Sequence, residues 1–177
     1  MLALAAGFAF GSYHLAYPST HWGCADLCGP NATLACVQSS EENERVARLA
    51  ADAGVIHFWV GSYQRPAGEE PGGGWDVCQS GETVNFAKWY RGPQPIWQDG
   101  PQPDNWHGAE ACAAVSHSHH LAEWPLLAEG WWYDLPCYLE LPCLCKHGAA
   151  DPSKALWCGG CSHGSPLDGV LGYSDEI

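Results

Sequence analysis

Ten cysteines in 177 residues are the side chains with the most evident chemistry in this sequence. They extend from Cys24 to Cys161, and so high a density is typical of chains that fold in an oxidising compartment. We therefore expect a framework of disulfides. Two glycines separate Cys158 from Cys161, and we favour a small-loop disulfide there over a redox pair or half a zinc site, because this tail holds no second pair.

Two other patterns match reactive sites by residue type alone. His117, His119 and His120 could suggest zinc, but they precede Leu121 in what we expect to be an exposed polar turn. The segment 160–164 matches the Gly-x-Ser-x-Gly elbow of hydrolases, yet no apolar strand precedes it and no helix follows it. No nucleophile, base and orienting group fall in one structured region, so the sequence does not predict an enzyme.

The charge balance excludes two classes of partner. Twenty acidic residues against seven basic ones give a formal charge of −13, which repels phosphate backbones and anionic lipid surfaces. We expect no nucleic-acid partner, and no apolar run reaches the roughly 18 residues that a membrane span requires. The acidity is compatible with cation binding and equally with a soluble acidic surface.

The two ends of the chain differ in composition from its middle. Residues 1–12 are small and apolar like part of a signal peptide, without its positive first region, and we interpret them as a degenerate or partial signal segment. The triplet Asn31-Ala32-Thr33 is a glycosylation sequon, with Asn31 as the acceptor. Both features favour a secreted or extracellular glycoprotein. Gly, Ser, Asp and Pro dominate after Lys146, so we predict one domain over 13–147 and a tail over 148–177.

Local patterns predict two helices and several strands. Ser39 and Glu42 form a capping box for a helix that ends at Gly54, and a shorter helix is expected over 22–28. Between 62 and 108 the chain is rich in Gly, Pro and Trp, which indicates a long ordered loop region. Strands are expected over 13–17, 33–37, 55–60, 110–115 and 130–133, with Cys143 and Cys145 on a closing strand.

The order of these signals resembles the C-type lectin-like fold. The elements that carry the resemblance are Cys28, the segment 40–43, Trp59-Val60-Gly61, Trp75, the segment 86–89, Gln102-Pro103-Asp104, Glu110 before Cys112, Trp132-Tyr133-Asp134 before Cys137, and Leu144-Cys145-Lys146. The resemblance implies an α+β fold in which two helices flank small antiparallel sheets with a long loop region, stapled by disulfides. It implies the pairs Cys28–Cys145 and Cys112–Cys137. The pairing of Cys24, Cys36, Cys78 and Cys143 stays open, with Cys36–Cys143 as our guess because both would lie on inner strands.

The resemblance also implies a calcium site that binds sugar. Its ligands would be Gln102, Asp104, Glu110 and Asp134, all with the hard oxygens that calcium prefers. The order Gln-Pro-Asp is the one that galactose-type members of the family carry, and Trp106 stands where they place a ring against the sugar. The implied partners are glycans or glycoproteins with terminal galactose or N-acetylgalactosamine. Such sites are individually weak and usually act in multiples, so an oligomeric or multidomain context is compatible with this function.

One residue departs from the family pattern. Tyr133 stands where the family has an asparagine that binds both the ion and the sugar. By its position Tyr133 is a sugar-binding candidate together with Gln102, Asp104, Trp106 and Glu110, but a neutral phenol is a poor calcium ligand. The calcium site then either persists as a weak site or fails. A second family calcium site is disfavoured because Ala111 replaces an aspartate, and the bond before Pro103 is expected to be cis. The alternative function is a lectin-like domain that binds protein, ice or mineral through the long-loop surface.

Overall fold

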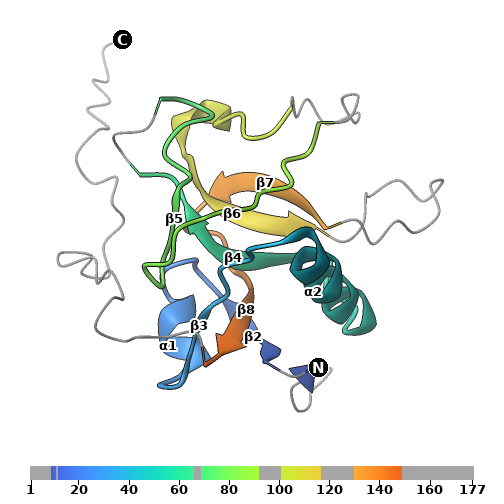
Figure 1. Ribbon diagram of the computed structural model, residues 1–177. Helices are drawn as coiled ribbons and strands as arrows, with labels where there is room; N and C mark the ends of the chain where they lie inside the picture. Colours follow the sequence, from blue (N-terminus) through green and yellow to red (C-terminus); the bar gives the residue numbers. More distant parts are fainter. Residues whose placement is uncertain (1–8, 11, 66–68, 92–100, 117–129, 149–177) are drawn as a thin grey trace, which may run out of the picture.

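Figure 1 shows a computed structural model of the chain, which describes residues 9–10, 12–65, 69–91, 101–116 and 130–148. The expectations for the segment 1–8, the histidine cluster, the Cys158–Cys161 pair and the tail from residue 149 lie outside these ranges. The elements in chain order are β1 (Ala9–Phe10), β2 (Tyr13–Ser19), α1 (Cys24–Cys28), β3 (Ala32–Leu34), α2 (Ser40–Asp52), β4 (His57–Tyr63), β5 (Val77–Cys78), the 3₁₀ turn η1 (Trp106–Gly108), β6 (Glu110–Ser116), β7 (Trp131–Pro136) and β8 (Leu141–His147).

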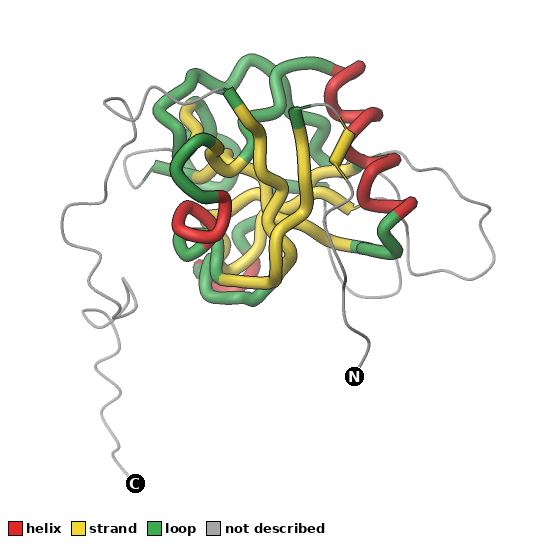
Figure 2. The backbone as a smooth tube through the Cα atoms, turned by 90° about the horizontal axis from the view of Figure 1, so that it is seen from below, coloured by secondary structure: helices red, strands yellow, loops and turns green. Residues whose placement is uncertain are grey.

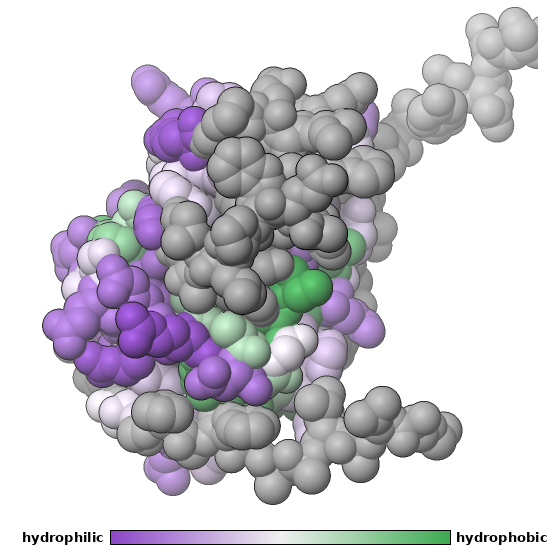
Figure 3. Space-filling view, turned by 90° about the vertical axis from the view of Figure 1, so that its right-hand side faces the viewer, coloured by the Kyte–Doolittle hydropathy of each residue, from purple (hydrophilic) through white to green (hydrophobic). Residues whose placement is uncertain are grey.

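Helix α2 forms where the capping box predicts it. The Ser39 hydroxyl accepts a hydrogen bond from the Glu42 N–H at 3.1 Å, and the helix buries Val46, Leu49 and Ala50. In a capping box the Glu42 carboxylate would accept the backbone N–H of Ser39. Here it accepts the N–H of the preceding residue, Gln38, at 2.8 Å. Glutamates and arginines occupy the outer face of α2, and Figure 3 shows a hydrophilic region on this side of the molecule, next to a smaller apolar patch. One apolar stripe therefore fixes which way the helix faces.

The strands form a single sheet whose two faces are both buried. Its order is β1-β2-β8-β4-β6-β7, with β3 paired to β8 and β5 to β4; β4 meets β8 in parallel, whereas every other pairing is antiparallel. Successive side chains of a strand point to opposite faces. Phe58 and Val60 accordingly join the core under α2, while Trp59 between them joins the core under α1. Figure 2 shows the two helices on opposite sides of the strands.

Four disulfides join the described residues, and they correct one guess. Two are the pairs that the family resemblance implies, Cys28–Cys145 and Cys112–Cys137. The guess of Cys36–Cys143 is wrong, because the structure pairs Cys24 with Cys143 and Cys36 with Cys78. Cysteines four apart on a helix are separated by about 6 Å along its axis. Cysteines two apart on one face of a strand are separated by about 6.6 Å. The spacing of Cys24 and Cys28 on α1 therefore matches that of Cys143 and Cys145 on β8, and two disulfides join these elements.

Asn43 connects the helix to the strand that carries part of the candidate site. Its fully buried amide donates to the Gly130 carbonyl at 2.9 Å and accepts from the Trp132 indole N–H at 2.8 Å. Gly130, with φ of 59°, approaches so closely that a Cβ atom there would lie 2.5 Å from the Asn43 amide nitrogen. Asn43 therefore fixes the start of β7 against α2.

Replacing Asn43 by alanine should destabilise the fold strongly. The change leaves a buried carbonyl and a buried indole N–H without their partner, and each such group costs about 1–3 kcal/mol. We expect the free energy of unfolding to fall by about 2–4 kcal/mol in urea titrations. Glu44→Ala, on the exposed face of the same helix, is the matched control and should change it by less than about 0.5 kcal/mol. Equal effects of the two variants would contradict the role given to Asn43.

Candidate cation site

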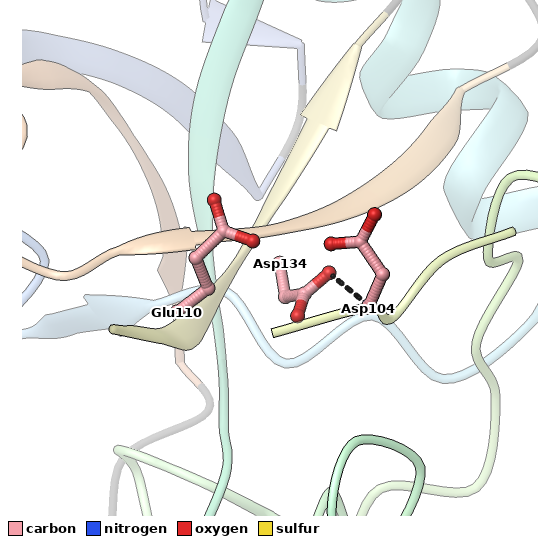
Figure 4. Close-up of side chains that lie close together, drawn as sticks. All are labelled: Asp104, Glu110 and Asp134. Carbon is pink, nitrogen blue, oxygen red and sulfur yellow. Dashed lines mark hydrogen bonds between the residues drawn. The ribbon is translucent and has the colours of Figure 1, made fainter. Parts of the chain in front are cut away.

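Three carboxyl groups from separate parts of the chain point toward one another (Figure 4). Asp104 precedes η1, Glu110 is the first residue of β6, and Asp134 lies on β7. One oxygen from each lies within 4.8 Å of those of the other two. The antiparallel pairing of β6 with β7 brings Glu110 and Asp134 to the same end of the sheet, and the η1 loop adds Asp104.

Backbone N–H groups hold these carboxylates in place. Asp134 accepts the N–H of Asp104 at 3.1 Å and that of Asn105 at 2.8 Å, while Glu110 accepts the N–H of Trp106 at 2.9 Å. Three consecutive amides can point inward because the loop turns sharply, with Asn105 at φ 48° and His107 at φ 58°. Positive φ is uncommon outside glycine, and asparagine is among the residues that adopt it most readily. The loop is thus shaped around the carboxylates.

The site favours protonation when no cation is bound. Burial of the Glu110 carboxyl, together with the negative charges of Asp134 and Asp104 and a hydrogen bond to Asp104, raises its pKa to about 8, although the Trp106 N–H opposes the shift. Burial likewise raises the pKa of Asp134, against the amides of Asn105 and Asp104. A positive charge among these groups would relieve the repulsion that raises both pKa values.

The arrangement fits a hard divalent cation in ligand type and in size. All three groups offer oxygen, and calcium takes oxygens at about 2.3–2.6 Å, so two of its ligands lie at most about 5.2 Å apart. The separations within 4.8 Å meet that limit. Asp104, Glu110 and Asp134 are the residues that would hold such an ion.

Gln102 lies beside this cluster. Its side chain is 3% exposed, and its amide oxygen accepts the backbone N–H of Asp134 at 3.3 Å. A side-chain amide offers both an acceptor oxygen and a donor nitrogen. The Gln102–Pro103 bond is cis, as predicted. Gln102 thus contacts the backbone of Asp134, whereas the three carboxylates converge on one another.

The two aromatic residues singled out from the sequence behave differently. Trp106 is 52% exposed at the η1 turn, with its ring centroid 4.0 Å from that of His107. The Tyr133 ring stacks on Tyr90, with centroids 5.5 Å apart. Tyr133 points away from its neighbours Trp132 and Asp134, as alternation along β7 requires. The three carboxylates converge in spite of the substitution at position 133.

Sequence reasoning missed Asn105, Glu70 and Gln64. The Asn105 side chain accepts the Glu110 N–H at 3.1 Å and donates to the Glu70 carboxylate at 2.8 Å. Gln64 also donates to Glu70, at 3.2 Å. The tolerance of asparagine for positive φ, directly after a proposed ligand, was a local signal for Asn105. Nothing local indicated Glu70, which lies 35 residues away.

A family model for the lectin C-type domain matches residues 17–147 of this chain, which is well over half of its length. The chain belongs to the C-type lectin domain family. Its fold is the C-type lectin-like fold, with two α-helices and four disulfides among the described residues. No helix in the part of the chain that the structure describes is long and apolar enough to cross a membrane.

Relatives of this C-type lectin domain include proteins with different names and roles. Regenerating islet-derived protein 3-beta of Rattus norvegicus is 27% identical over 147 residues, which cover 78% of this chain and 73% of that protein. C-type lectin CEL-I of Cucumaria echinata superposes with a TM-score of 0.55 at 22% identity, covering 80% of this chain and 94% of that one. The herring type II antifreeze protein superposes with a TM-score of 0.52 at 18% identity, covering 80% and 94%. At these identities the structural matches support the shared fold alone.

In EDTA, stability should fall as the pH rises from 6.5 to 8. Folded Glu110, with a pKa of about 8, stays mostly protonated until the pH approaches 8, whereas the unfolded carboxyl, with a pKa near 4.5, has already lost its proton. The unfolded state is therefore favoured by each step upward in pH. At 1.36 kcal/mol per pKa unit the expected loss is roughly 2 kcal/mol, measured by urea unfolding.

Two variants separate this effect from other titrations. Glu110→Gln should remove most of the decline, and Glu69→Gln, at an exposed site, should preserve it. The pKa of buried His21 is lowered to about 4 by desolvation, so its effect on stability is confined to pH values below about 6.5. A wild-type protein as pH-independent as Glu110→Gln would refute the protonation assigned to Glu110.

Proposed function

We propose that this chain is a calcium-dependent lectin that binds terminal galactose or N-acetylgalactosamine on glycans. The observation that carries the proposal is the convergence of Asp104, Glu110 and Asp134 within 4.8 Å, next to the buried amide of Gln102. The family assignment makes a carbohydrate ligand the first expectation, and the oxygen-only donor set makes calcium the first choice of ion.

The sugar would be held by both the ion and the chain. A bound calcium would supply coordination positions for two vicinal hydroxyls of the sugar. Asp104 and Glu110 accept hydrogen bonds from the same hydroxyls, and the Gln102 amide is the neutral group that can donate to them. Gln102 places a donor amide and Asp104 an acceptor carboxylate in the order that galactose-type members of the family carry. We expect this order to suit the axial hydroxyl of galactose.

Trp106 supplies the apolar part of the proposed site. More than half of the residue is exposed, and it follows Asp104 by two residues on the η1 turn. One face of galactose carries several C–H groups and packs well on a flat aromatic ring. An exposed tryptophan at this position is thus an asset for sugar binding, whereas elsewhere it would only expose apolar surface to water.

The same proposal places the protein outside the cell. Four disulfides agree with an oxidising compartment. Asn31 is exposed directly before β3, where an attached glycan would extend into solvent, so we propose it as a glycosylated residue. An oligomer or a multidomain chain would add the avidity that one shallow site lacks.

A second function has one observation in its favour. Tyr133 takes the place of the family's asparagine and stacks on Tyr90, so it adds no oxygen to the carboxylate cluster in this arrangement. If the site is too weak for calcium, the same loop surface would bind a protein, ice or a mineral. Calorimetry without calcium uptake at millimolar concentration would favour that function.

Retention on immobilised galactose tests the proposal directly. The protein should bind the matrix in calcium and be released by EDTA or free galactose. Asp134→Asn should abolish retention, because it removes a charge and weakens two acceptor bonds at the cluster. Asp26→Asn, exposed on α1, removes the same charge and should bind as wild type does. Binding that is indifferent to both EDTA and galactose would defeat the proposal.

Exchanging the two polar groups should change the sugar preference. The double variant Gln102→Glu/Asp104→Asn keeps the net charge but inverts the donor and acceptor that face the hydroxyls, so mannose should replace galactose as the best ligand on a glycan array. Trp106→Ala should weaken galactose binding about tenfold, equal to roughly 1.4 kcal/mol of contact with the sugar face. An unaltered array profile for both variants would contradict the roles of these residues.

A further inference from the structure

Glu70 contacts the candidate site although it is outside the carboxylate cluster. It lies in the turn formed by residues 69–74, which belongs to the chain between β4 and β5. Its Oε2 atom accepts hydrogen bonds from Asn105 Nδ2 at 2.8 Å and from Gln64 Nε2 at 3.2 Å. One carboxylate oxygen thus joins two loops that are 35 residues apart in sequence.

Asn105 passes this connection on to two of the proposed ligands. Its backbone N–H donates to Asp134 Oδ2 at 2.8 Å, and its Oδ1 atom accepts the Glu110 N–H at 3.1 Å. Its backbone has the left-handed conformation, with φ 48° and ψ 50°. Such a conformation is sparsely populated without support. The oxygen and the nitrogen of the Asn105 side chain are both hydrogen-bonded, which stabilises this backbone conformation. The same bonds thereby fix the direction of the Asn105 backbone N–H.

Gln64 anchors the other end of the connection to the sheet. It is 7% exposed, and its backbone N–H donates to the Ala111 carbonyl at 2.8 Å. Its Nε2 atom also lies 2.9 Å from the Gly73 carbonyl and 3.2 Å from the Pro71 carbonyl. Through Gln64, the turn that carries Glu70 is therefore hydrogen-bonded to the end of β4 and to β6, which holds the Glu70 acceptor beside Asn105.

We propose that Glu70 and Asn105 are positioning residues for the cation site. Glu70 holds the Asn105 amide, and Asn105 sets the distance between Asp134 and the start of β6. Glu70 acts through the place of its oxygen, because a neutral acceptor at the same point can take the same two hydrogen bonds. This inference rests on the proposed function, since it assigns residues that support the same calcium site.

A different role for Glu70 makes a different prediction. A carboxylate near a cation site also attracts the ion at long range, and that effect depends on charge alone. Glu69 and Glu70 are both exposed and carry the same charge. The backbone carbonyl of Glu69 accepts the Gly73 N–H, and this bond does not involve its side chain. Glu69→Ala therefore removes an equal charge without removing the link to Asn105.

The test compares calcium affinity by calorimetry in five variants of the full chain, four single and one double. Glu70→Ala should weaken calcium binding about tenfold, which is the lower end of the effect typical of groups that orient metal ligands. Glu70→Gln keeps a hydrogen-bond acceptor and Glu69→Ala keeps the link to Asn105, so both should stay within about twofold of wild type. Asn105→Gly removes the side chain while allowing positive φ, and adding Glu70→Ala to it should weaken binding no further. Equal losses in Glu70→Gln and Glu70→Ala, or in Glu69→Ala and Glu70→Ala, would overturn the inference.

A second measurement separates this inference from the proposed function. Hydrogen exchange at the Asn105 and Trp106 amides in EDTA reports the position of the loop without calcium. Glu70→Ala should speed exchange at both amides, and Glu70→Gln should not. If the wild type takes up no calcium, the proposed function fails, and this difference in exchange still supports the positioning role. Exchange that is unchanged in Glu70→Ala overturns that role whether or not calcium binds.

Discussion

Negative charges repel one another, and yet the structure keeps oxygens of Asp104, Glu110 and Asp134 within 4.8 Å of each other. Three inward-pointing amides from one sharply turned loop hold two of these groups, and burial removes the water that would otherwise screen them. Burial and then the neighbouring charges of Asp134 and Asp104 raise the pKa of Glu110 to about 8. A surface that only had to stay soluble would let these side chains separate, so the loop is built to keep acidic groups together.

The sheet supplies the stiffness that such crowding needs. Both of its faces are buried, and α2 is tied to the strand that carries Asp134 by the amide of Asn43. The Cys112–Cys137 bridge joins the strand that begins at Glu110 to the end of β7. The two strands therefore resist moving apart. The carboxyl groups stay close together, and the pKa values of Glu110 and Asp134 are raised while the strands remain paired.

Local signals account for what the sequence predicted well. Helix α2 follows from Ser39, Glu42 and a one-sided apolar stripe, all within one short window. The convergence of the carboxylates was implied by family spacing alone. The pairing of Cys24 with Cys143 was missed because it requires α1 to pack directly against β8, with the cysteine spacing of a helix opposite that of a strand. The link from Glu70 to Asn105 was missed for a similar reason, because it depends on the path of two loops and no short pattern encodes it.

The two bridges between α1 and β8 each close a covalent ring, and the chain from Cys28 to Cys143 belongs to both rings. All of the residues assigned to the cation site fall within this part of the chain. A protease that cuts the backbone once between those two cysteines would leave both pieces joined by two disulfides. Single nicks would then leave one molecule with its strands still paired, so a broken peptide bond alone does not disperse the ligand groups.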